Sequence, residues 1–299
     1  MTTDDVVTTD DVVTTDDVVT TDDAVVAAHG IRVAVARAGG AISSIEAHGV
    51  ELLARTPWAD EGLGGVDDAW RMPSSSAEWH RRYPGGWHLL TPAAGDPAPE
   101  AAVDQPFHGE AAWRSWRVRV DGDAAIVTEV LLRTAPLRIT RTVSVAQEHV
   151  FVDTVVRNES ATAQRIVWVE HPALAGALFD DADVELDDGA DAPIAVDIVA
   201  APGSRFADLA TASGRVAIRS ASTGLDVTMT WDAALLPRVY VWQERRGSEG
   251  FPWWGAVDAV GIEPASDPYG TATLGSGSVT VPGRGERRTR LTWEIRPRG

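Results

Sequence analysis

Apolar and polar residues alternate along much of the chain from Ile31 onward. In 137–145 and 290–295, leucine, isoleucine, valine or tryptophan alternates with arginine, threonine, serine or glutamate. A period of two puts successive side chains on opposite faces of an extended backbone, so both segments predict half-buried β-strands. Further strands are expected at 31–36, 116–120, 124–132, 150–156, 165–169, 216–218, 225–231, 239–242 and 272–281.

These short strands are separated by turns rich in Gly, Asp, Asn and Pro, and no amphipathic helix longer than about two turns is evident. The pattern predicts an all-β protein with a sandwich architecture. Two stretches, 59–102 and 179–212, lack the alternation and are expected to be loops. The first is rich in Trp, His and Arg, which favours a functional loop. The second is acidic, with a spacing unlike a calcium-binding EF-hand, which favours a solvated loop over a site.

Residues 2–23 repeat the hexapeptide TTDDVV and contain eight Asp residues. Like charges repel in such a segment, and its paired valines follow neither a strand nor a helix period. We therefore expect a disordered acidic tail over 1–26, followed by one domain over 27–299. An interaction tail or a pairing strand is the alternative.

Charge and composition exclude several classes of partner and of function. The 299-residue chain has a net charge of −18, and all 26 of its basic residues are Arg. Nucleic acid and anionic membrane surfaces are therefore disfavoured as partners. It has no Cys, no apolar segment long enough to cross a bilayer and an acidic N-terminus, so we expect a cytoplasmic protein without disulfides or a thiolate nucleophile. Nucleotide-binding, zinc-protease and serine-hydrolase motifs are absent from the sequence.

The chain contains 12 Trp, and aromatic faces suit the C–H face of a sugar ring. Tryptophans in alternating strands are expected in the core, namely Trp116, Trp231 and Trp293. Tryptophans among Gly, Pro and polar residues are expected in a binding cleft, namely Trp79, Trp87, Trp242, Trp253 and Trp254.

Three short motifs supply candidate proton-transfer groups: His108 in FHGEA, His171 in VEHPA and Glu263 in GIEP. A proline follows both His171 and Glu263, which indicates that each lies at the end of a strand. One His and one ionised Glu can together take a proton from an anomeric hydroxyl and deliver one to the ring oxygen. This chemistry requires neither a metal nor a cofactor.

The order His, His, Glu-Pro, with a Gly-Gly-Trp segment before the first histidine, resembles the aldose 1-epimerase (galactose mutarotase) family. The resemblance implies a large antiparallel β-sandwich, the galactose mutarotase-like supersandwich. It also implies His171 as general acid, Glu263 as base and His108 as a sugar-binding residue. Glu110 stands where the family has an aromatic residue, so it joins the candidate substrate-binding residues.

Two neighbours of His171 also depart from the family pattern. Ala173 replaces an aromatic residue and could enlarge the pocket. Glu170 could raise the pKa of His171 if the two side chains meet.

The segment RRYPGGW resembles the hexose-6-phosphate epimerase branch of that family, in which an arginine near this point binds the substrate. Arg81 or Arg82 is therefore expected to bind a sugar hydroxyl or phosphate, with a surface ion pair as the alternative. Arg141 occupies an apolar phase of its strand, which a binding role or a β-bulge would explain.

Together these features predict a cofactor-free isomerase that interconverts the α and β anomers of an aldose or aldose phosphate. One alternative is a related enzyme that abstracts a C–H proton from a modified or oxidised sugar. Another is a non-catalytic carbohydrate-binding protein. In each case the expected partner is a small sugar.

Overall fold

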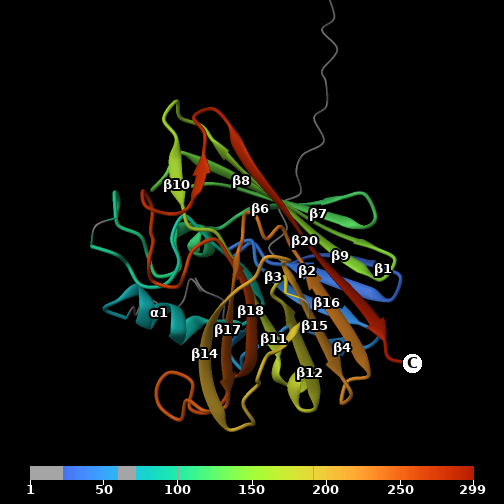
Figure 1. Ribbon diagram of the computed structural model, residues 1–299. Helices are drawn as coiled ribbons and strands as arrows, with labels where there is room; N and C mark the ends of the chain where they lie inside the picture. The colour runs from blue at the N-terminus through green and yellow to red at the C-terminus, as the bar shows by residue number, and fades with distance from the viewer. Residues whose placement is uncertain (1–22, 60–71, 100, 191) are drawn as a thin grey trace, which may run out of the picture.

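The computed structural model describes residues 23–59, 72–99, 101–190 and 192–299 (Figure 1). This part of the chain forms two large antiparallel sheets stacked on each other, together with a two-stranded ribbon. The all-β sandwich prediction is therefore confirmed. Residues 1–22 of the expected tail, and Trp70 in the first expected loop, lie outside the described residues. Residues 24–26 belong to the strand Ala24–Ala28, so the expected end of the tail at residue 26 is wrong.

Strands of the first sheet run, in spatial order, β1 (Ala24–Ala28), β2 (Ile31–Val35), β3 (Ile42–Ala47), β5 (Trp87–Leu90), β11 (Val169–Ala175), β18 (Asp258–Ala265), β17 (Arg238–Arg245) and β14 (Gly203–Ala210), with β4 (Val50–Glu51) paired to β3. The second sheet runs β13 (Ile194–Ala195), β12 (Ala182–Asp187), β15 (Arg215–Ser220), β16 (Leu225–Thr230), β20 (Glu286–Pro297), β9 (His149–Asn158), β8 (Leu137–Ala146), β7 (Ala125–Leu131) and β6 (Arg117–Asp121). The ribbon pairs β10 (Gln164–Ile166) with β19 (Val279–Val281). Helical segments are α1 (Ser75–Arg82) and the 3₁₀ turns η2 (Glu110–Trp113) and η3 (Gly176–Phe179).

The main hydrophobic core lies between the two sheets. Trp87 of β5 stacks on Trp293 of β20 with ring centroids 4.9 Å apart, and Trp116 and Trp231 belong to the same core. The expected core positions of Trp116, Trp231 and Trp293 are therefore confirmed.

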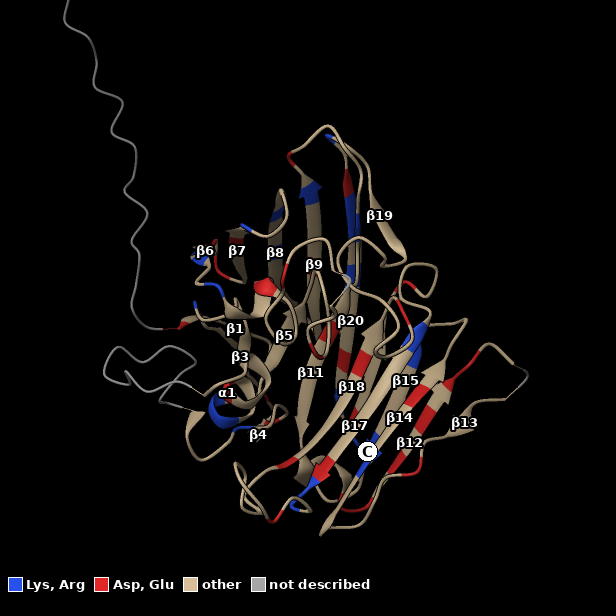
Figure 2. Ribbon diagram, turned by 90° about the vertical axis from the view of Figure 1, so that its left-hand side faces the viewer, with Lys and Arg blue, Asp and Glu red and all other residues tan. Residues whose placement is uncertain are grey.

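A second apolar cluster covers the outer face of the first sheet, where α1 packs (Figure 1). The helix begins after Ser74, whose side chain accepts a hydrogen bond from the Ala77 amide at 3.1 Å. It buries Trp79 in the cluster, while its last turn carries the basic residues visible in Figure 2. The helix and the neighbouring loops thus form a wall over the middle of the sheet.

The expectation that 179–212 is a loop is wrong, because it contains β12, β13 and β14. Strand β14 is an edge strand with largely exposed or half-buried residues, so backbone pairing with β17 holds it in place rather than burial of a core face. In 59–102 the described residues form α1 and the short strand β5. None of the described helices is long and apolar enough to span a membrane.

Candidate functional site

A cavity of about 150 Å³ opens on the outer face of the first sheet, where Trp79 and His80 of α1 form part of its wall. Its lining is almost entirely aromatic or titratable: Trp79, His80, Tyr83, Phe107, His108, His171, Phe206, Trp242, Trp253, Glu263 and Tyr269. His108, His171, Trp242 and Glu263, all predicted from the sequence as site residues, therefore meet in one place. Trp79 and Trp253, which were expected in a binding cleft, line the same cavity, whereas Trp254 is exposed outside this lining.

His171 and Glu263 lie on the neighbouring central strands β11 and β18. Imidazole Nε2 is 3.5 Å from carboxylate Oε1, and both side chains are buried. The two strands pair at Val169 with Ala265 and at Ala173 with Gly261, and the ladder skips the residues between. The acid–base candidates therefore face each other across a local opening in the sheet.

Both residues lie inside their strands, so the expectation that each ends a strand is wrong. Strand β18 continues through Pro264, which pairs with Val239 of β17, and β11 continues four residues beyond His171. Proline is tolerated here because the ladder between β11 and β18 is already interrupted.

Gly261 makes room for the Glu263 carboxylate. Residues two apart in a strand share a face, and a Cβ atom on Gly261 would lie 2.3 Å from Glu263 Oε1. The glycine of the GIEP motif therefore allows the carboxylate to fold back over its own strand.

Burial controls protonation in the cavity. It lowers the pKa of His171 to about 4 and raises the pKa of Glu263 well above its usual value. Burial therefore favours the uncharged form of both groups, a protonated Glu263 carboxyl group and a neutral His171 imidazole. Acid–base work requires an ionised Glu263 and a protonated His171, a state that differs from this one by one proton moved from the carboxyl group to the imidazole.

His108 has a defined tautomer. Its Nδ1 accepts a hydrogen bond from the Gly95 amide at 3.1 Å, and burial lowers its pKa well below the usual value. The ring is therefore neutral, and its proton lies on Nε2. A neutral imidazole with Nε2–H in a cavity is a hydrogen-bond donor for a sugar oxygen.

Tyr83 is a polar group of the cavity that the sequence did not single out as a site residue. Its side chain is 2% exposed, and its ring lies edge-on to His171 at a centroid distance of 5.9 Å. Among the described residues its hydroxyl has no hydrogen-bond partner. Burial and then the nearby Glu263 raise its pKa, so the phenol stays neutral. The sequence signal for Tyr83 was its position directly before Pro84, Gly85 and Gly86, where the backbone lies close to neighbouring β-strands.

Four predicted binding residues lie outside the described cavity lining. Arg81 and Arg82 both form ion pairs with Glu78 on α1, as in the alternative, but Arg82 and Glu78 are buried rather than at the surface. Trp87 is a core residue instead of a cleft residue, because β5 turns it toward the second sheet. The Glu110 carboxylate caps a turn by accepting hydrogen bonds from the amides of Arg133 and Thr134 at 2.7–2.9 Å.

Glu170 does not meet His171, because adjacent residues of a strand point to opposite faces. Its carboxylate lies in the inter-sheet core, where it accepts a hydrogen bond from Arg141 at 2.7 Å and from the Trp87 indole at 2.8 Å. The pKa of His171 is lowered, so the expected rise is wrong. Arg141 is explained by this buried ion pair, since the register of β8 against β9 runs without a bulge.

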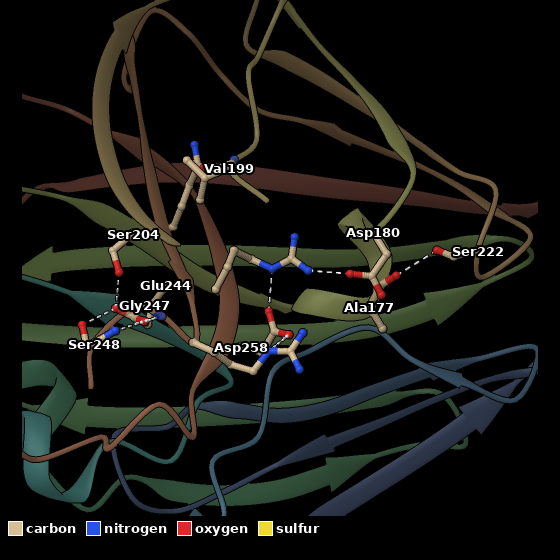
Figure 3. A network of polar contacts seen from close by, with 12 residues as sticks. Ala177, Asp180, Val199, Ser204, Ser222, Glu244, Gly247, Ser248 and Asp258 are labelled. Carbon is tan, nitrogen blue, oxygen red and sulfur yellow. Dashed lines mark hydrogen bonds and ion pairs between the residues drawn. The ribbon is translucent and has the colours of Figure 1, made fainter. Parts of the chain in front are cut away.

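Two aspartates directly before β12 contact other parts of the chain. Asp180 and Asp258 both point toward the guanidinium of Arg245, at 2.6 and 2.5 Å (Figure 3). Asp181 accepts a hydrogen bond from the Ser222 amide. No group of three potential metal ligands occurs among the described residues.

Comparisons with known proteins bear on the fold. No protein-family model matches the sequence, and no curated protein matches it. Among solved structures, a galactose mutarotase-like protein from Clostridium acetobutylicum is 14% identical with a TM-score of 0.63, covering 91% of this chain and 94% of that one.

A galactose mutarotase-like protein from Lactobacillus casei is 15% identical with a TM-score of 0.60, covering 92% and 100%. An aldose epimerase homologue from C. elegans is 10% identical with a TM-score of 0.61, covering 93% and 100%. At these identities the likeness concerns the fold. The chain therefore has the galactose mutarotase-like fold.

Proposed function

We propose that this protein is a cofactor-free sugar isomerase that interconverts α and β anomers, with Glu263 as base and His171 as acid. The observation that carries the proposal is the close approach of these two buried groups, 3.5 Å apart, inside an aromatic cavity. Among the described residues, Glu263 Oε1 has no hydrogen-bond partner, so it is available to a ligand.

The proposed reaction moves two protons. Glu263 takes the proton from the anomeric hydroxyl while His171 gives its proton to the ring oxygen, and the bond between C1 and the ring oxygen breaks. The open-chain aldehyde turns about its C1–C2 bond and closes again on the other face. On closure Glu263 gives its proton to the aldehyde oxygen and His171 takes the proton of the attacking hydroxyl, so the pair starts the next cycle unchanged.

An uncharged sugar suits the site better than a sugar phosphate. The described lining contains no arginine, and its histidines have lowered pKa values because they are buried. A phosphate dianion would lose its hydration there without gaining a cation. The neutral tautomer of His108 and the hydroxyl of Tyr83 can instead bind sugar hydroxyls.

Exchange NMR of the anomeric protons tests the proposal across free sugars and their phosphates. We expect accelerated exchange for at least one free sugar, loss of that acceleration in His171→Asn, and retention in His149→Asn. His149 is a matched control because it lies on β9, in the other sheet. Binding without accelerated exchange of any sugar would contradict the isomerase and favour a carbohydrate-binding protein.

A further inference from the structure

One row of side chains links the acid–base pair to the edge of the first sheet. Directly paired residues of antiparallel strands project on the same face. The register pairs Ala173 with Gly261, Gly261 with Trp242, and Trp242 with Phe206. The inner two residues are small and leave space beside the pair, whereas the outer two are aromatic. The cavity is therefore continued by aromatic rings toward the edge strand β14.

The outer part of the cavity wall is exposed to solvent. Phe206 and Tyr269 line the cavity, yet each is 44% exposed. Their ring centroids are 4.9 Å apart and the ring planes are inclined by 55°. Aromatic rings left open at the mouth of a polar cavity are typical of a ligand-binding surface. We call Phe206 and Tyr269 the aromatic rim.

The aromatic rim is held in place by the sheet beneath it. The Tyr240 ring packs against both rim residues at 5.9 and 5.6 Å, and its hydroxyl donates to the backbone carbonyl of Asp267. The Tyr269 amide donates to Asp208 at 2.9 Å. A ligand would therefore meet a surface that needs little ordering on binding.

We propose that the aromatic rim is a subsite for a second pyranose ring, so that the protein acts on the reducing end of a di- or oligosaccharide. This proposal rests on the proposed function. A cavity of about 150 Å³ is small beside the roughly 300–1,000 Å³ pockets that hold drug-sized ligands, so it suits one ring. The next ring then lies over Phe206 and Tyr269, where its C–H face packs on aromatic carbon and its hydroxyls stay in water.

Exchange NMR on sugars that share the same reducing-end ring tests the subsite. Glucose, cellobiose, maltose and lactose are compared in the wild type, Phe206→Ala, Tyr269→Ala and Phe251→Ala. Phe251 is the matched control, because it is 53% exposed but outside the described cavity lining. In each rim variant we expect kcat/KM to fall about three- to tenfold more for the disaccharides than for glucose, with no change in the control.

Equal losses for glucose and the disaccharides would overturn the subsite and leave the isomerase standing. If the wild type accelerates exchange of none of these sugars, the proposed function fails for them, and the subsite is tested separately by binding. Methyl β-cellobioside and methyl β-glucoside cannot open their rings, so their dissociation constants report binding alone. Tighter binding of the cellobioside that is lost in Phe206→Ala supports the subsite, and equal binding of both overturns it.

Discussion

Single residues of the cavity set the position and charge of its reacting groups. Gly261 leaves the space into which the Glu263 carboxylate folds, and Tyr83 adds a neutral hydroxyl beside it. Neither residue could itself transfer the proposed protons at neutral pH. Both roles can be tested by a substitution that changes one heavy atom, added at Gly261 or removed at Tyr83.

Gly261→Ala is expected to displace the Glu263 carboxylate, because the added Cβ would lie 2.3 Å from its oxygen. The clashing atom is the end of a flexible side chain, so the fold should survive. A displacement of about 1 Å can cost roughly 100-fold in rate, and we expect kcat to fall between 10- and about 100-fold. Gly250→Ala is the control, since a Cβ there has nothing within 4 Å. Equal activity of the two variants would show that Gly261 does not position the base.

Tyr83→Phe removes a buried hydroxyl that has no hydrogen-bond partner among the described residues. Thermal unfolding should therefore shift little or to higher temperature, while kcat/KM should fall by about 5- to 100-fold through the loss of one hydrogen bond to substrate. A panel of monodeoxy sugars identifies the contact, because the sugar lacking the contacted hydroxyl should be insensitive to the substitution. Unchanged kcat/KM with every sugar would exclude this contact.

At the scale of elements, β11 carries different chemistry on its two faces. His171 points into the cavity, and Glu170 points into the inter-sheet core toward Arg141 on β8. The buried ion pair therefore connects the strand of the proposed acid to the opposite sheet.

Arg141→Met should destabilise the protein by about 3–5 kcal/mol in urea unfolding, because it leaves the Glu170 carboxylate buried without its cation. Adding Glu170→Gln should recover part of this loss, since the amide is uncharged and its one oxygen can still accept a hydrogen bond from the Trp87 or the Trp168 indole. A double variant less stable than Arg141→Met would contradict this explanation.

Alternation in the sequence predicts the strands whose outer face meets solvent, such as β8, β9 and β16. It fails for β11 and β18, because they are buried on both faces and their apolar residues no longer alternate. The edge strand β14 is missed for the opposite reason, since it buries little. Local patterns therefore cannot predict elements that tertiary pairing holds in place.

The same limit applies to the site. His171 and Glu263 stand out because each belongs to a short motif, whereas Phe206 reaches the cavity only through the register of β14 against β17. Trp87 and Trp242 both have Gly, Pro and polar residues as sequence neighbours. Trp87 nevertheless projects into the inter-sheet core and Trp242 into the cavity, because they lie on opposite faces of the first sheet.

At the scale of the whole molecule, buried histidines should make stability depend on pH. Burial lowers the pKa of His88 to about 3 and that of His171 to about 4, from 6.5 in the unfolded chain. Their folded pKa values are depressed, so their contribution to stability is greatest above pH 6.5 and falls as the unfolded chain takes up protons. Glu263 acts in the opposite direction, because its pKa is raised in the folded protein.

Urea unfolding between pH 6.5 and 4.5 tests this balance. We expect the free energy of unfolding to fall as pH falls, and His88→Asn to reduce the slope by about 1.4 kcal/mol per pH unit, the value for one proton. The slope reports proton uptake independently of any general destabilisation by the substitution. A slope that stays the same in His88→Asn would show that His88 titrates alike in both states.

The most direct measurement is the turnover of Glu263→Gln in anomer exchange. The amide keeps the shape of the side chain but cannot accept the proton, so kcat should fall by about 10²- to 10⁴-fold while the fold and sugar binding remain. His171→Asn should lose a comparable factor, and the double variant should lose much less than the product of the two, because the residues act as one unit. A folded Glu263→Gln protein that keeps more than about half of the wild-type kcat would contradict acid–base catalysis by this pair.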